Sequence, residues 1–126
     1  MAFEVVTEEN NSWGSRMRQF ASGATRDTDD TKPDYEGFLS PEVLKRFGAY
    51  MTEHRVQADG KLRASDNWKK GIPRDVYLKS QLRHTIDQWH LHRDGVPLGE
   101  RKHLEDACCA ILFNVAGYLY ELLKGR

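Results

Sequence analysis

Three long stretches of this chain alternate apolar and polar residues with the 3.6-residue period of an α-helix. The first begins with Ser40 at the N-cap position and Pro41 in the first turn, and should end before residue 59. The second begins at Pro73 and carries an apolar stripe of Leu78, Leu82, Ile86 and Trp89. The third runs from about residue 100 or 102 to residue 123. Asp94, Gly95 and Pro97 separate the last two stretches, so the pattern predicts an antiparallel hairpin of two helices.

The N-terminal third is less regular. Trp13, Met17 and Phe20 recur at i, i+4 and i+7, which predicts a short amphipathic helix over residues 12–21. Residues 22–37 are rich in Gly, Asp, Thr and Pro and predict a loop, and residues 61–72 predict an ordered loop. No stretch alternates convincingly at period two, so we expect strands to be few or absent.

These elements together predict an all-α protein, a compact helical bundle with long ordered N-terminal loops. The length of 126 residues fits a single helical domain over residues 1–126, with residues 1–12 as a flexible N-terminal segment. The charged content of 30% indicates a thin core. The apolar last helix also needs covering, so we expect a homo-oligomer, a dimer or a tetramer.

Charge and hydropathy narrow the classes of partner. The chain has 19 basic and 19 acidic residues and therefore a formal net charge of zero. No net positive potential attracts a nucleic acid or an anionic membrane. The uncharged run over residues 107–120 is shorter than the roughly 20 residues of a membrane span. The N-terminus lacks the order of a signal peptide. We therefore expect a cytoplasmic protein with no nucleic acid and no membrane among its partners.

The sequence predicts a buried amide in the helical hairpin that needs a hydrogen-bond partner. Asn114 is the only strongly polar side chain in the uncharged run, and a buried amide without a partner costs roughly 1–3 kcal/mol. The facing helix carries a polar stripe at i, i+3, i+4 and i+7, made of Ser80, Arg83, His84 and Asp87. An antiparallel hairpin places Ser80 opposite residues 110–114. The pattern therefore predicts that Ser80 or a neighbour satisfies Asn114.

The same hairpin brings acidic residues toward the other end of the stripe. His84 and Asp87 should lie opposite residues 103–110, near Glu105 and Asp106. Carboxylates that project from facing helices can hold a divalent metal, and Mg²⁺ held in this way completes its shell with water and substrate phosphates. The alternative is structural, with Arg83 and Asp87 paired and His84 in a buried hydrogen-bond network.

Two loops contain residues suited to a nucleotide. In the loop over residues 23–37, Arg26 and Lys32 could clamp a phosphate, although such a charged loop could also be only solvated. In the later loop, Trp68 could stack on a base and a lysine could meet a phosphate. Equally, the Trp68 ring could pack in the core of the helical bundle.

The order of three short motifs resembles a known family. The chain carries N-W-x-K-G, R-H and F-N motifs, formed by Asn67, Trp68, Lys70 and Gly71, by Arg83 and His84, and by Phe113 and Asn114. Over residues 23–123 the chain resembles the dATP/dGTP diphosphohydrolase-like proteins of phages. The resemblance implies a distant relationship to MazG-like all-α nucleoside triphosphate pyrophosphohydrolases, which cleave between the α and β phosphates with magnesium.

The resemblance also implies roles for individual residues. Asp87, Asp106 and Glu105 would hold Mg²⁺ or Mn²⁺, and His84 would orient a water or a phosphate oxygen. Lys70 and Arg83 would hold phosphates. The chain departs from the MazG pattern because it contains no E-x-x-E and no E-x-x-D pair. This departure weakens the case for hydrolysis more than the case for nucleotide binding.

We therefore expect a metal-dependent nucleotide pyrophosphohydrolase that converts a purine (d)NTP to (d)NMP and pyrophosphate. The expected catalytic residues are His84 and Asp87. The expected substrate-binding residues are Arg26, Lys32, Trp68, Lys70, Arg83 and Asn114. The alternative is a phage protein, in the host cytoplasm, that binds and sequesters a nucleotide or nucleotide signal without hydrolysing it.

Overall fold

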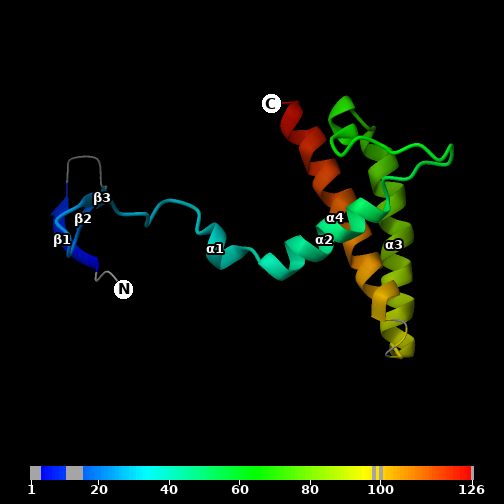
Figure 1. Ribbon diagram of the computed structural model, residues 1–126, viewed down its shortest axis with the longest axis horizontal. Coiled ribbons are helices and arrows are strands. Elements are labelled where there is room, and N and C mark those ends of the chain that lie inside the picture. The colour runs from blue at the N-terminus through cyan, green and yellow to red at the C-terminus, as the bar shows by residue number, and fades with distance from the viewer. Residues whose placement is uncertain (1–3, 11–15, 98, 100, 126) are drawn as a thin grey trace. The chain divides into compact units, whose positions relative to one another are not determined.

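The computed structural model describes residues 4–10, 16–97, 99 and 101–125 (Figure 1). The chain divides into two compact units, Met1–Leu39 and Ser40–Arg126. The single domain expected over residues 1–126 remains a prediction. The flexible segment expected over residues 1–12 lies partly outside the described residues, and residues 4–10 form a strand.

The N-terminal unit contains a small antiparallel sheet with the strand order β1-β2-β3. The strands are β1 (Glu4–Asn10), β2 (Arg16–Phe20) and β3 (Thr25–Asp27). The central strand pairs with both neighbours, with Val6 opposite Arg18 on one side and Arg18 opposite Arg26 on the other. A short helix, α1 (Tyr35–Phe38), follows, and the Asp34 carboxylate accepts a hydrogen bond from the Gly37 N–H.

The helix expected over residues 12–21 is wrong where the structure describes it, because Arg16–Phe20 is strand β2; residues 12–15 lie outside the described residues. Backbone pairing with strands on both sides outweighs a pattern of only three apolar residues at helical spacing. Within β2, Arg18 and Phe20 share one face of the pleat, and the guanidinium lies 5.5 Å from the ring centroid. The region expected to be loop over residues 22–37 also contains β3 and α1.

The C-terminal unit is helical. It consists of α2 (Pro41–Glu53), a short 3₁₀ helix η1 (Asn67–Lys70), α3 (Arg74–Asp94) and α4 (Arg101–Lys124). The Ser40 hydroxyl accepts a hydrogen bond from the Val43 N–H at the start of α2, and Gly95 has a positive φ of 76° directly after α3. The three long helices that the periodicity predicts are confirmed.

Helices α3 and α4 lie side by side and run in opposite directions (Figure 1). Near the start of α3, the Ile72 N–H donates to the Glu121 carboxylate near the end of α4. Toward the other end, the Gln88 amide donates to the Cys108 sulfur. Low-numbered residues of α3 therefore meet high-numbered residues of α4, which confirms the antiparallel hairpin.

The core of this unit is small. Tyr77 is only 1% exposed and lies against Gly117, where the lack of a side chain makes room for the ring. Helix α2 packs on α4 through Tyr50, which contacts Cys109 and Ala110. A mostly helical fold is thus shown, although the N-terminal sheet makes the all-α description only approximate.

Helix α4 is long and apolar enough to cross a membrane, as judged by length and composition over the described residues. The core helix of a soluble protein meets the same criteria. The cytoplasmic location therefore remains a prediction.

Candidate functional site

The C-terminal unit contains a cleft of about 770 Å³ between the end of α2, the following loop, η1 and the α3–α4 hairpin. We call it the main cleft. Its volume lies within the range of small-molecule sites. The polar, charged and aromatic residues that could contact a ligand there include Tyr50, His54, Arg55, Arg63, Asn67, Trp68, Ser80, His84, Phe113 and Asn114.

The loop after α2 brings two arginines to the main cleft. The Arg55 Nε donates to the backbone oxygen of Arg63 at 2.9 Å, and a backbone bridge joins Val56 to Leu62. These contacts fold residues 55–63 back on themselves. Arg55 and Arg63 consequently line the same wall, although their sequence positions alone gave no signal of it.

An aromatic wall closes part of the main cleft. Trp68 in η1 packs edge-on against Tyr120 of α4, with ring centroids 4.6 Å apart. Trp68 also lines a smaller, apolar cavity of about 300 Å³ together with Phe47, Met51 and Phe113. Both sequence interpretations of Trp68 thus have a structural basis, since the ring packs on the bundle and also lines the cleft.

Asn114 has the polar partner that the sequence predicts. Its side chain is 5% exposed, and its Nδ2 donates to the Ser80 hydroxyl at 3.2 Å and to the Ala110 carbonyl at 2.8 Å. These bonds fix the amide between α3 and α4. Asn114 therefore forms an ordered polar part of the cleft wall.

A second cleft, of about 390 Å³, adjoins the main one and shares Tyr50, His54 and His84 with it. We call it the histidine cleft. Its remaining ionisable lining residues are Asp87, His90, His103 and Asp106. The His84 Nδ1 lies 3.8 Å from the Asp87 carboxylate, as an ion pair when the imidazole is protonated. The structural alternative of an Arg83–Asp87 pair is absent from the ion pairs of the described residues.

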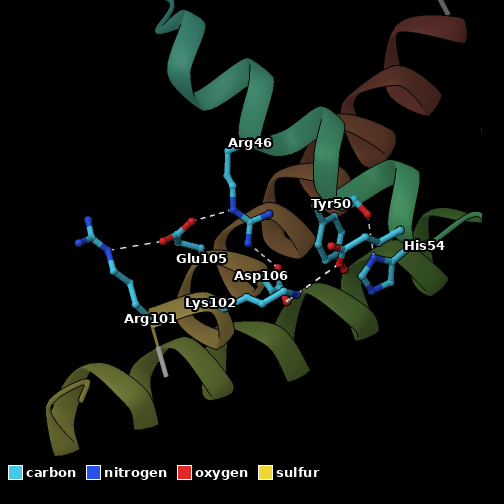
Figure 2. A network of polar contacts seen from close by, with 8 residues as sticks. Arg46, Tyr50, His54, Arg101, Lys102, Glu105 and Asp106 are labelled. Carbon is cyan, nitrogen blue, oxygen red and sulfur yellow. Dashed lines mark hydrogen bonds and ion pairs between the residues drawn. The ribbon is translucent and has the colours of Figure 1, made fainter. Parts of the chain in front are cut away.

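The acidic residues of α4 are already paired with cations, as Figure 2 shows. Arg46 of α2 donates from Nε to Glu105 at 2.7 Å and from Nη2 to Asp106 at 2.6 Å. Lys102 donates to the other Asp106 oxygen at 2.9 Å, and Arg101 lies 3.5 Å from Glu105. Nothing in the sequence pattern pointed to Arg46 as the partner of these carboxylates.

These contacts change the protonation behaviour of the cluster. Partial burial by itself would raise the pKa of Asp106, but the hydrogen bonds from Lys102 and Arg46 outweigh burial and lower that pKa below its ordinary value. The same hydrogen bonds raise the pKa of Lys102 and of Arg46. Asp106 is therefore a carboxylate at neutral pH, with its charge compensated.

The fit of this region to a metal ion is poor. Among the described residues, no three His, Cys, Asp or Glu side chains converge as a metal site. A metal at Asp106 would have to compete with Arg46 and Lys102 for its oxygens. Asp87 lines the histidine cleft but is 65% exposed at its side chain.

The remaining predicted residues lie elsewhere. Arg26 and Lys32 are exposed in the N-terminal unit. Lys70 and Arg83 are exposed in the C-terminal unit and do not line the main cleft or the histidine cleft. The structure therefore gathers Trp68, His84 and Asn114 in the main cleft, and His84, Asp87 and Asp106 in the histidine cleft.

Tyr50 and His54 are further cleft residues that the sequence pattern did not reveal. Tyr50 lies in the last turn of α2 and His54 directly after the helix. Their ring centroids are 4.0 Å apart, and the His54 Nδ1 lies 2.8 Å from the Tyr50 carbonyl oxygen. Their i, i+4 spacing was a usable signal. It could not show, however, that α2 crosses the hairpin at this point.

Comparison of the chain with protein-family models, with curated proteins and with solved structures finds no match. The chemistry of the two clefts is therefore the main guide to function.

Proposed function

We propose that this protein binds a purine nucleoside triphosphate across the main cleft and the histidine cleft, and hydrolyses it to the monophosphate and pyrophosphate. The observation that carries this proposal is the junction of the two clefts at His84. An aromatic and guanidinium surface lies on one side, and imidazoles with carboxylates lie on the other. The rings and guanidiniums of the main cleft suit a base and its phosphates, and His84 lies where this cleft meets the histidine cleft.

The base is assigned to the aromatic wall of the main cleft. Trp68 and Phe113 offer ring faces or edges for stacking, and Asn67 offers an amide for the base edge. Arg55 and Arg63 are assigned to phosphate oxygens, because a guanidinium matches phosphate with paired hydrogen bonds. The preference for a purine comes from the sequence resemblance.

The proposed reaction uses groups at the junction. A water attacks the α-phosphorus while His84 accepts one of its protons, and the Asp87 carboxylate at 3.8 Å stabilises the resulting imidazolium. A new P–O bond forms to the water oxygen. The bond from the α-phosphorus to the bridging oxygen breaks, and the electron pair leaves with pyrophosphate.

The family resemblance implies Mg²⁺ or Mn²⁺, which would neutralise the phosphates. The ion pairs of Glu105 and Asp106 do not favour a metal held by the chain alone. The proposed reaction therefore relies on side chains of this chain, and a metal requirement is tested by adding or omitting each ion.

Turnover is tested by incubating the protein with each of the four dNTPs, with and without Mg²⁺ or Mn²⁺, and measuring pyrophosphate. We expect release from dATP or dGTP. His84→Asn should lower kcat about 100-fold, since it removes the base. His92→Asn is the matched control, because His92 is exposed on the same helix and lines neither cleft. Absence of pyrophosphate under every condition would exclude hydrolysis.

A second candidate is nucleotide binding without turnover, as a sequestering protein. The specific observation in its favour is that Arg46, Arg101 and Lys102 already compensate the α4 carboxylates. In this case, dATP or dGTP should raise the melting temperature and should be recovered intact after denaturation. Arg55→Ala and Arg63→Ala should each weaken the shift. Conversion of the ligand to a monophosphate would eliminate this candidate.

A further inference from the structure

The α3–α4 hairpin carries a large apolar surface on the side away from α2, which we call the hairpin face. Its large apolar side chains are between 40% and 61% exposed. Helix α3 contributes Leu78, Leu82 and Trp89, and helix α4 contributes Leu112, Val115, Leu119 and Leu122.

Helical periodicity places the α4 residues on one side. Asn114 points toward α3 through its bond to Ser80, and Asp106 points toward α2 through its bond to Arg46. With about 100° of rotation per residue, Val115 and Leu119 fall on the flank opposite the α2 flank. This flank of α4 is therefore uncovered within the unit.

The same reasoning applies to α3. His84 and Asp87 line the histidine cleft on the α2 side of the hairpin. Leu78, Leu82 and Trp89 lie roughly half a turn around the helix from these two residues. Both apolar flanks lie opposite the α2 side, so they belong to the same side of the hairpin.

The middle of the hairpin face lacks charge, whereas near the turn the Arg93 guanidinium lies 5.7 Å from the ring centroid of Trp89. Between its apolar residues, α3 presents Gln81, Thr85 and Gln88, and α4 presents Leu104, Cys108 and Ile111. None of these positions is charged, in a chain with 30% charged residues. Depletion of charge over an apolar patch is the compositional signature of an interface core.

We propose that a second copy of this chain packs on the hairpin face, so that two hairpins form a four-helix bundle. The seven large apolar side chains expose on the order of 700 Å² per copy, close to the about 800 Å² that each partner buries in a standard interface. The uncharged middle of the face can pack on itself across a twofold axis without opposing like charges. Each copy keeps its two clefts, because they open on the α2 side of the hairpin.

The test is the mass of the full chain in solution, measured by light scattering after gel filtration over a wide range of concentration. We expect twice the chain mass of 14.6 kDa. Leu119→Glu should roughly halve the measured mass, since a buried charge opposes association. The helical circular dichroism signal should remain, because Leu119 is 51% exposed in the single chain.

The matched control is Leu44→Glu, because Leu44 is also 51% exposed but lies on α2. This variant should keep the mass of the dimer. The Cys108 thiol gives a second readout, since it is exposed in the single chain and lies on the hairpin face. It should react slowly with a thiol reagent in the unsubstituted protein and faster in Leu119→Glu.

Three outcomes would overturn this proposal. The first is a monomer at every concentration. The second is a dimer that survives Leu119→Glu but dissociates with Leu44→Glu. The third is a monomer that binds phosphatidylcholine vesicles through α4, which would assign the apolar surface to a membrane instead.

Discussion

Among the single residues of the candidate site, Asp106 has the most heavily compensated charge. Hydrogen bonds from Lys102 and Arg46 lower its pKa despite partial burial. Because the folded-state pKa lies below the unfolded value, this group stabilises the fold at pH values above the ordinary range of Asp. That contribution is lost as the pH falls through the folded-state pKa.

We therefore expect the free energy of unfolding to fall as the pH drops through and below the ordinary titration range of Asp, in part through Asp106. Asp106→Asn should be less stable than the unsubstituted protein at neutral pH. Its stability should also depend less on pH in the acid range, so the two curves should converge. Urea unfolding followed by circular dichroism across this pH range measures both effects, and parallel curves would contradict the assignment.

Gly117 is a second residue whose role is steric. A Cβ at this position would collide with the ring of Tyr77, which is the most deeply buried side chain of the core. Gly117→Ala should therefore destabilise the protein by about 1–3 kcal/mol, as overpacking does in other cores.

Gly48→Ala is the matched control, because Gly48 lies in helix α2 and a Cβ added there would have no neighbouring atom within 4 Å. This variant should stabilise the protein by up to about 1 kcal/mol through helix propensity. Thermal denaturation of both variants measures the two changes in stability. A Gly117→Ala variant as stable as Gly48→Ala would show that the Tyr77 ring can move aside.

At the level of secondary-structure elements, the position of α2 determines where the clefts form. Arg46 joins α2 to two carboxylates of α4 (Figure 2), and Tyr50 packs on Ala110 at the same crossing. Tyr50 near the end of this helix and His54 directly after it line both clefts. The clefts thus depend on a helix held by Arg46, by an ion pair of 3.3 Å between Glu53 and Lys102, and by a small apolar contact.

We expect Arg46→Met to loosen α2 while the α3–α4 hairpin stays formed. The substitution keeps the aliphatic stem but leaves Glu105 and Asp106 without the guanidinium. Hydrogen–deuterium exchange should therefore accelerate across α2 and change little in the middle of α3 and α4. Lys45→Met, at an exposed neighbouring position, should leave the exchange pattern unchanged. Equal acceleration in all three helices would indicate global destabilisation.

Across the molecule as a whole, the C-terminal unit has few fully buried apolar residues and many half-exposed ones. A helical hairpin can hide one face against α2, but it needs another partner for the opposite face. Association of two copies would supply that partner and enlarge the core. Folding and association would then be linked.

This linkage predicts that the melting temperature rises with protein concentration in the unsubstituted protein. The melting temperature of Leu119→Glu should not depend on concentration, since that variant is expected to be monomeric. Differential scanning fluorimetry over a series of concentrations measures both. A melting temperature independent of concentration in both proteins would argue against linked association.

Local patterns in the sequence were enough to establish the three long helices, the antiparallel hairpin and the partner of Asn114. Each depends on local periodicity, on caps such as Ser40, or on the need of a buried amide for a hydrogen bond. These signals lie within one helix or between two helices joined by a short turn. These features can therefore be predicted from the sequence alone.

The N-terminal sheet, the crossing of α2 and the pairing of Glu105 and Asp106 with Arg46 emerged only from the folded arrangement. The fold also brought Arg55 and Arg63 to the main cleft beside Trp68. Strand pairing and ion pairs join segments far apart in sequence, and their free energy depends on distance and burial that periodicity does not encode. For this reason the sequence indicated which side chains have suitable chemistry, whereas the fold determined which of them meet.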